Sequence, residues 1–428
     1  MAKNTDPSLQ TQVIYSVYVR CHTEEGSFRA LMADLDRIRA LGADMIWLMP
    51  IHPIGVQGKK GSLGCPYANR DYRSVNPAYG TMEDFLALVD AIRARGMRVL
   101  IDVVYNHTSP DSVLYAEHPE FFYRRPDGRP GNRVGEWTDV IDLDYSVPAL
   151  WDYQIESLRF WAGLVDGFRC DVASLLPPDF WRRARAAVAE VNPDCVWLAE
   201  TVHTGFGNQC RREGLAAARD VELFDAFDLE YEYDIRETFD AWMAGRLPLS
   251  AWTDALNFQE AVYPDNYNKL RFLENHDQPR IASLVHDEKA LDALTAMLFF
   301  LKGTTLLYAG QEFSDTHRPS LFEREPIDRS GRDISALLRR LAEIKKTALA
   351  PDDWFLAEAD DAQGVALLQR GGARGRTVGL FPLAGKGGEV RLDAPDGDYE
   401  DLLCGGAVSV KNGRISCPDR AIIFTLPA

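Results

Sequence analysis

Hydrophobic and polar positions along most of this chain follow a repeating order: an amphipathic helix, a glycine, then a short apolar strand. Residues 28–41 place their apolar side chains on one helical face, and Gly42 follows them. The next helix has Thr81 as a candidate N-cap, with Asp84 at the position of a capping-box acid. Gly96 ends that pattern, and a nearly continuous apolar run follows. The pattern predicts helices alternating with buried strands.

Eight short apolar runs are predicted as strands. They are residues 13–19, 45–49, 99–104, 165–170, 196–199, 223–229, 270–273 and 304–308. Strands that are buried on both faces lose the alternation of polar and apolar residues, as these runs do. The alternation of eight such strands with helices predicts the α/β class and a (β/α)₈ TIM barrel. A doubly wound open sheet is the alternative, but no glycine-rich phosphate loop follows the first strand.

Two regions depart from the alternation. Residues 108–143 are rich in proline and glycine and are too long for an ordinary connection after the third strand. They are predicted to form a short inserted domain. From about residue 350, short runs of alternating polarity between Gly, Asp and Pro turns predict an antiparallel β-domain over residues 350–428. The barrel is therefore assigned to residues 1–107 and 144–349.

Composition and charge narrow the class of partner. The formal net charge is −17, from 47 basic and 64 acidic residues, which argues against nucleic acid and is compatible with a neutral sugar or with simple solubility. The sequence predicts neither a membrane span nor disulfide bonds. The apolar stretch 291–309 is interrupted by Asp292, Lys302 and Gly303, so no membrane span is expected. Seven irregularly spaced cysteines and a polar N-terminus predict free thiols and a cytoplasmic location. The oligomeric state is left open.

Candidate chemistry gathers at the predicted carboxyl ends of four strands, where the active sites of such barrels lie. Acidic side chains, two histidines and an arginine occur in the segments Asp102–His107, Gly167–Asp171, Trp197–Glu200 and Phe272–Asp277. Each residue alone has a simpler explanation, such as a helix cap, a packing contact or a structural ion pair. Their joint occurrence on four strand ends favours one site.

Glycosidic bond cleavage needs one anionic and one protonated carboxyl group. Consecutive strands place Asp171 and Glu200 side by side, and Arg169 points to the same side of its strand as Asp171. A guanidinium favours the charged form of Asp171, whereas Glu200 among like charges tends to keep its proton. Asp102, in the middle of an apolar strand, is interpreted as a brace for a loop. The separation of the two carboxyl groups cannot be obtained from the sequence.

The four segments resemble, in order and spacing, the conserved regions of the α-amylase family of glycoside hydrolases over roughly residues 12–345. Leu306–Glu312 and Pro66–Tyr72 resemble two further family segments. The resemblance implies a retaining double displacement in which Asp171 is the nucleophile, Glu200 the general acid/base and Asp277 the stabiliser of the transition state. It also implies substrate contacts: Tyr67 stacks on the sugar, His107 and His276 hydrogen-bond to it, Arg169 orients Asp171, and Arg280 matches an arginine of some members.

The sequence departs from the family at one position that concerns calcium. Many calcium-binding members carry Lys-His after the nucleophile segment, where this chain has Ser174 and Leu175. A leucine side chain offers no ligand atom. Oxygen ligands remain at Asn106 and at three acids, Asp139, Asp142 and Asp144, but the set is incomplete. No metal site and no required cofactor are therefore expected.

The expected substrate is an oligosaccharide, with cleavage of α-1,4 bonds in maltooligosaccharides. Val172 and the segment Asn275–Arg280 resemble members that act on α-1,6 bonds, so an oligo-α-1,6-glucosidase is one alternative. A transglycosylase or sugar isomerase using the same intermediate is another. Two other classes fit less well. An inactive binding protein would have lost the three acids that this chain keeps, and a metal-dependent barrel hydrolase would carry an HxH pair on the first strand.

Overall fold

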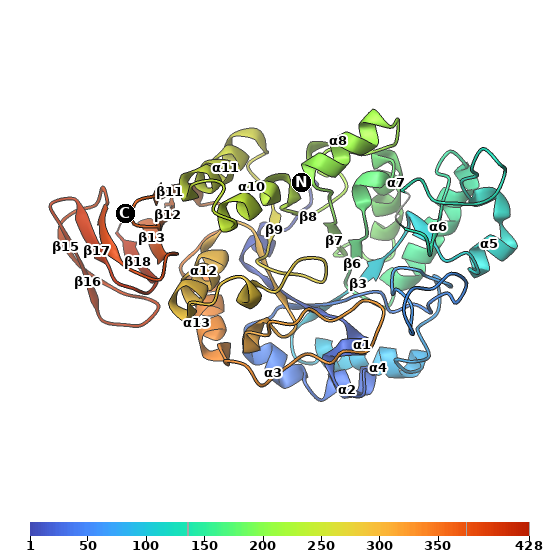
Figure 1. Cartoon of the computed structure of the whole chain (residues 1–428), viewed down its shortest axis with the longest axis horizontal. Coiled ribbons are helices and arrows are strands. Elements are labelled where there is room, and N and C mark those ends of the chain that lie inside the picture. Colours follow the sequence, from blue (N-terminus) through green and yellow to red (C-terminus); the bar gives the residue numbers. More distant parts are fainter. Residues whose placement is uncertain (135–136, 374, 428) are drawn as a thin grey trace. The chain divides into compact units, whose positions relative to one another are not determined.

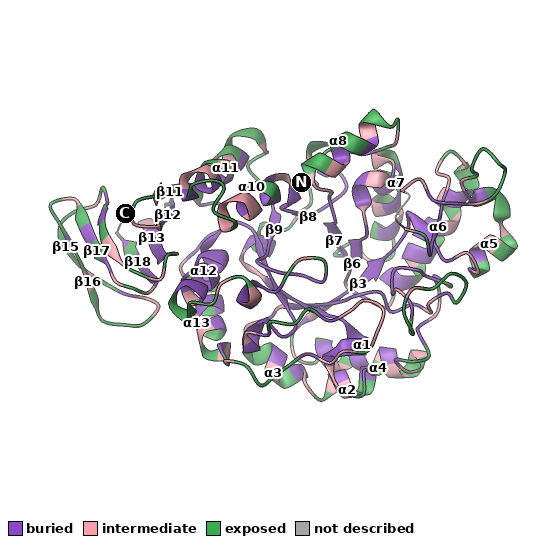
Figure 2. Cartoon of the chain, viewed as in Figure 1, coloured by how far each residue is buried: buried purple, intermediate pink, exposed green. Residues whose placement is uncertain are grey.

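The structure is a computed structural model that describes residues 1–134, 137–373 and 375–427. Among these residues, eight parallel strands form a closed barrel in the order β1-β10-β9-β8-β7-β6-β3-β2 (Figure 1). Their bounds are β1 Val13–Val17, β2 Met45–Leu48, β3 Arg98–Val103, β6 Gly167–Cys170, β7 Val196–Ala199, β8 Leu229–Tyr231, β9 Lys269–Arg271 and β10 Thr304–Tyr308. The predicted TIM barrel is confirmed, and Figure 2 shows its strands as buried.

One predicted strand was placed too early in the chain. The predicted sixth strand, residues 223–229, starts at the last residue of the short helix α9 (Asp220–Leu223), and β8 begins only at Leu229. Asp220 and Glu222 in the first turn of α9 favour a helix start, because acids complement the positive end of the helix dipole. The apolar residues Leu223 and Phe227 are buried without belonging to a strand, so hydrophobicity alone misplaced it.

Helices connect the strands in the predicted alternation. They are α1 Val19–His22, α2 Phe28–Met32, α3 Leu35–Ala40, α4 Met82–Arg93, α5 Val113–Glu117, α6 Pro148–Ala162, α7 Pro178–Ala189, α8 Thr204–Arg212, α9 Asp220–Leu223, α10 Tyr233–Met243, α11 Leu249–Val262, α12 Glu288–Phe300 and α13 Ser335–Thr347. The capping box of Thr81 and Asp84 at the start of α4 is confirmed. The single helix predicted over 28–41 is broken into α2 and α3 near Asp34, whose carboxylate pairs with His22 and Arg37.

The segment after β3 contains the two-residue strands β4 (His107–Thr108) and β5 (Ile141–Asp142), which pair antiparallel, and helix α5. Residues 135–136 of the predicted insertion lie outside the described residues. The antiparallel pair fixes His107 opposite Asp142 at the start and end of this segment. The boundaries of the insertion as a separate domain stay a prediction.

Two antiparallel sheets follow α13, in the orders β11-β12-β13-β18 and β14-β17-β16-β15. Their strands are β11 Trp354–Asp360, β12 Val365–Gly372, β13 Gly375–Pro382, β14 Gly388–Arg391, β15 Gly397–Glu400, β16 Ala407–Lys411, β17 Arg414–Cys417 and β18 Ile422–Leu426. A shared cluster of buried apolar side chains joins the sheets. This confirms the predicted antiparallel β-structure.

The chain divides into two compact units. One contains residues 1–4, 14–231 and 318–328, and the other contains residues 5–13, 232–317 and 329–428. All seven cysteines are free thiols, as predicted. Across the described residues, no helix is both long and apolar enough to cross a membrane.

Candidate active site

Arg169 is the centre of the candidate site in the first unit. It lies on β6, is fully buried, and its Nη1 donates to Asp171 Oδ1 at 2.8 Å. Its Nη2 lies 2.8 Å from Glu200 Oε1, but the N–H is not aligned for a hydrogen bond, so this contact is an ion pair. Because β6 and β7 are paired, the two acids leave neighbouring strand ends. The guanidinium is shared between both carboxylates, whereas the sequence argument assigned it to Asp171 alone.

A third carboxylate completes the surroundings of Arg169. Asp102 on β3 is fully buried, and Arg169 Nη1 donates to its two oxygens at 2.9 and 3.1 Å. Burial opposes the charge of Arg169, but Asp102 and then Glu200 raise the pKa of its guanidinium well above the usual value. The sequence interpretation of Asp102 as a loop brace missed this contact. The sequence did indicate that Asp102 has an ionic partner, because a charged side chain inside an apolar strand has to be paired.

Aromatic side chains enclose the same guanidinium. The Arg169 Cζ atom lies 5.1 Å from the ring centroid of Trp47, 5.6 Å from that of Tyr67 and 5.5 Å from that of Tyr231. Tyr67 is also tied to the carboxylate cluster, because its hydroxyl donates to Asp102 Oδ2 at 3.1 Å. Contacts of this kind fix a planar cation and exclude water from it. Trp47 and Tyr231 were not among the predicted site residues, because an apolar strand pattern gives them no distinguishing signal.

The turn after Asp171 holds Glu200 from the other side. The backbone N–H of Val172 donates to Glu200 Oε2 at 2.7 Å, and the N–H of Ala173 donates to the Glu200 carbonyl at 2.9 Å. Val172 has φ 35° and ψ 45°, a left-handed conformation that is costly for a β-branched residue. Such strain concentrates at functional sites. Glu200 is thereby fixed by both Arg169 and the backbone beside Asp171.

His107 is buried in the same unit, at the start of the inserted segment. Asn106 Nδ2 donates to its Nδ1 at 3.1 Å, and its ring centroid lies 5.3 Å from that of Trp137. Burial lowers the pKa of His107, and the nearby Asp142 and Asp139 oppose that effect. A neutral imidazole with one nitrogen occupied by an amide is suited to a neutral polar ligand, such as a sugar hydroxyl.

The remaining predicted acid and histidine belong to the second unit, after β9. His276 is buried and its Nε2 lies 3.0 Å from Asp277 Oδ2, whereas the side chain of Asp277 is 41% exposed. Asn275 Oδ1 accepts from the backbone N–H groups of Asp277 and Gln278 at 2.8 and 2.9 Å. This Asx-type turn fixes the backbone at Asp277 and leaves its carboxylate accessible.

Arg280, predicted to contact substrate, is 1% exposed. Its Nη1 donates to Glu274 Oε1 at 2.7 Å, its Nη2 donates to the Ala309 carbonyl at 2.8 Å, and its Nε donates to the His317 carbonyl at 3.0 Å. These partners hold the loops after β9 and β10 together within the second unit. A direct contact of Arg280 with sugar stays a prediction, and its surroundings favour a positioning role.

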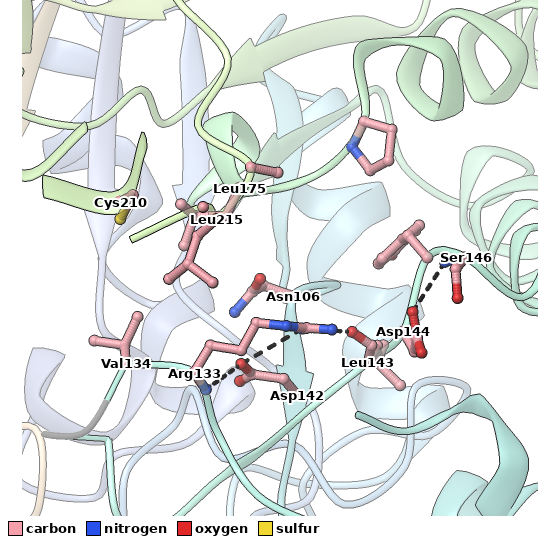
Figure 3. Close-up of a pocket in the computed structure, with 14 residues that line it drawn as sticks. Asn106, Arg133, Val134, Asp142, Leu143, Asp144, Ser146, Leu175, Cys210 and Leu215 are labelled. Carbon is pink, nitrogen blue, oxygen red and sulfur yellow. Dashed lines mark hydrogen bonds and ion pairs between the residues drawn. The ribbon is translucent and has the colours of Figure 1, made fainter. Parts of the chain in front are cut away.

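Three of the four residues considered for calcium lie around a pocket of about 310 Å³ in the first unit (Figure 3). Asn106, Asp142, Asp144 and Leu175 line it, but so does the side chain of Arg133. Within the described ranges, no group of three or more His, Cys, Asp or Glu side chains is arranged to hold a metal ion. The donor set therefore does not fit calcium, because a guanidinium stands among the oxygens that the ion would need.

Comparison with known proteins places these features in a family. The family model described as the α-amylase catalytic domain matches residues 4–127 and 135–346, and that of the bacterial α-amylase C-terminal domain matches residues 357–424. A solved α-amylase from Lactobacillus plantarum is 42% identical, with a TM-score of 0.94 and coverage of 98% of this chain and 100% of that one. The noncanonic maltogenic α-amylase AmyB of Thermotoga neapolitana is 32% identical, with a TM-score of 0.87 and the same coverage.

Among curated relatives, α-amylase MalA of Haloarcula japonica is 29% identical over 322 residues, which are 72% of this chain and 45% of that protein. Probable oligo-1,6-glucosidase 2 of Bacillus subtilis is 26% identical over 375 residues, or 72% and 66% of the two chains. The chain thus spans less than two thirds of the length of these two relatives. The catalytic-domain match alone covers well over half of its residues. The chain therefore belongs to the α-amylase family of glycoside hydrolases.

Proposed function

We propose that this protein is a retaining glycosidase that cleaves α-1,4 bonds in maltooligosaccharides and related α-glucans. One observation carries the proposal: Arg169 contacts Asp171 and Glu200 at 2.8 Å each, at neighbouring strand ends. A shared guanidinium holds two carboxylates close together. Retaining enzymes need a separation of about 5 to 5.5 Å, whereas inverting enzymes leave about 6.5 to 9.5 Å for a water molecule.

In the first step, an Asp171 oxygen attacks the anomeric carbon while the bond from that carbon to the glycosidic oxygen breaks. Glu200 transfers its proton to the departing oxygen, and a covalent glycosyl ester on Asp171 results. In the second step, water attacks the anomeric carbon, Glu200 takes the proton of that water, and Asp171 is released as a carboxylate. Asp277 is assigned to stabilise the distorted ring in both transition states.

The surrounding residues orient these groups. Arg169 holds Asp171 and Glu200, and Asp102 holds Arg169 and the Tyr67 hydroxyl. Tyr67 is assigned as the stacking platform for the reacting sugar, and His107 as a hydrogen-bond partner of that sugar. His276 lies beside Asp277 and is assigned the same kind of contact. We place Arg280 behind the loop that carries His276, as a positioning residue.

The α-1,4 assignment is supported by the two α-amylases that are 42% and 32% identical over almost the whole chain. The matches to α-1,6-acting relatives are weaker, at 26% identity for the Bacillus subtilis protein. Cleavage of α-1,6 bonds is therefore the second candidate. Turnover of maltotetraose should exceed that of isomaltotriose, and the reverse order would overturn the choice. Longer products or trehalose in the digest would indicate transglycosylation or isomerisation.

The roles of the two acids can be separated with a substrate whose leaving group needs no proton. Glu200→Gln should lose activity on maltotetraose but still release fluoride from α-maltosyl fluoride, whereas Asp171→Asn should lose both reactions. Proton NMR of the first product should show the α-anomer. Release of the β-anomer, or a Glu200→Gln variant equally inactive on both substrates, would refute the assignment.

A further inference from the structure

The side chain of Arg133 lines the pocket that also contains Asn106, Asp142 and Asp144, the residues considered as calcium ligands. Its Nη1 donates to the Leu143 carbonyl at 3.1 Å and lies 3.7 Å from Asp142 Oδ2, and its backbone N–H donates to the same oxygen at 2.7 Å. Its Cζ atom lies 4.3 Å from the ring centroid of Tyr123. Figure 3 shows the Arg133 side chain directed towards Asp142 and Leu143. The guanidinium is thus held by a carboxylate, a carbonyl and an aromatic face.

The other acids considered as calcium ligands already have partners within the protein. Asp139 pairs with Lys60 Nζ at 3.1 Å, and Asp144 Oδ1 accepts from the backbone N–H of Ser146 at 3.0 Å. Asp142 is 2% exposed, and its Oδ1 meets no hydrogen-bond donor among the described residues. Burial raises the pKa of the Asp142 carboxyl, and His107 and Arg133 oppose that rise. Arg133 is therefore the cation that the structure places beside the buried carboxylate of Asp142, as Lys60 is placed beside Asp139.

The groups that Arg133 binds are connected to His107. The backbone N–H of Leu143 donates to the Asn106 carbonyl at 3.0 Å, and Asn106 Nδ2 donates to His107 Nδ1 at 3.1 Å. His107 and Asp142 are also register partners in the β4–β5 pair. A displacement of residues 142–143 would consequently move both the backbone and the side-chain support of His107.

We infer that Arg133 serves as a built-in cation in place of the calcium ion of other family members. It fastens the middle of the inserted segment to Asp142 and Leu143 at the end of that segment and acts as a positioning residue for His107. The cation role stands on the contacts of Arg133 itself. The effect on substrate binding rests on the proposed function, because it needs His107 to contact sugar.

The test compares Arg133→Met with Arg133→Lys and with Arg129→Met, a control in the same segment whose side chain is exposed. Melting temperatures are measured for the full-length chain with EDTA, with calcium and with neither. Wild type should not respond to EDTA or calcium. Arg133→Met should melt roughly 2 to 6 °C lower, Arg133→Lys should recover part of that loss, and Arg129→Met should melt like wild type.

Kinetics on maltotetraose supply the positioning readout. KM should rise more than kcat falls in Arg133→Met, with partial recovery in Arg133→Lys. A wild-type melting temperature that falls with EDTA or rises with calcium would overturn the inference, as would an Arg133→Met variant that melts like Arg129→Met. A shift in kcat alone would overturn the positioning role. If wild type lacked glycosidase activity, the proposed function would fail, and the melting data would still decide the cation role.

Discussion

The conservative change Arg169→Lys tests the core of the proposed site. The guanidinium contacts three carboxylates, those of Asp102, Asp171 and Glu200, at distances between 2.8 and 3.1 Å. It does so because its planar fork presents several N–H groups in fixed directions, whereas an ammonium group is a compact point charge. Lysine can approach one of the three acids closely. The other two would lose their cationic partner while staying buried.

The expected loss follows from these contacts. A hydrogen bond or close contact to a charged group contributes about 1.5 to 3 kcal/mol of stabilisation. Losing two such contacts therefore costs about 3 to 6 kcal/mol. If that loss falls mainly on the transition state, kcat/KM decreases about 10²- to 10⁴-fold, since about 1.4 kcal/mol corresponds to a factor of ten. The same contacts support the fold, so the melting temperature should also fall.

The assay is kcat/KM on maltotetraose, with thermal melting and circular dichroism to confirm folding. Arg93→Lys is a matched control, because Arg93 also binds a carboxylate through two nitrogens, that of Asp166, but its side chain is 41% exposed. An exposed pair contributes less than about 1 kcal/mol, so the control should keep wild-type activity. A folded Arg169→Lys variant with kcat/KM within tenfold of wild type would refute the reasoning.

Three further outcomes are expected. Asp102→Asn should lower kcat/KM at least about tenfold while keeping the fold, because the amide still accepts from Tyr67 but no longer balances Arg169; unchanged kinetics would contradict the role of Asp102. Burial lowers the pKa of His52 to about 4, so its stabilising contribution is complete above about pH 6.5 and is lost as the pH falls towards 4. Between about pH 7 and pH 4.5, the free energy of unfolding measured in urea should fall by about 2 to 3 kcal/mol less in His52→Gln than in wild type. Parallel pH profiles of the two proteins would contradict this. Burial raises the pKa of Cys170 well above its usual value, so a thiol reagent should modify it only in denaturant, as mass spectrometry of peptides can show.

The barrel could be predicted because strands buried on both faces leave a continuous apolar run that side-chain polarity alone reveals. The strand ends then located Asp171 and Glu200, since parallel strands of a barrel present their carboxyl ends on one face. The sixth strand was misplaced because Leu223 and Phe227 are buried outside any strand. Three-dimensional packing, and not local pattern, decides such positions.

The ion-pair partners of a side chain were harder to predict than its place in the fold. Arg169 was correctly located, yet its link to Glu200 depends on how β6 and β7 are staggered, which the sequence does not specify. Arg133 was not among the predicted site residues, because it meets its partners Asp142 and Leu143 only where the inserted segment folds back on itself. Long cationic side chains can reach many groups, so their ion pairs follow from the fold.

Val172 shows most clearly why local rules fail at this site. A valine is among the least expected residues for a left-handed backbone, which costs L-residues about 1 to 2 kcal/mol, so no sequence pattern predicts φ 35° there. The observed contact supplies the reason, because this turn directs the Val172 N–H to Glu200 Oε2 at 2.7 Å. The proposed nucleophile and the proposed acid are then coupled through one peptide unit as well as through Arg169. A conformation that opposes local preference at that point is understandable if the fold is selected for the placement of Glu200 relative to Asp171.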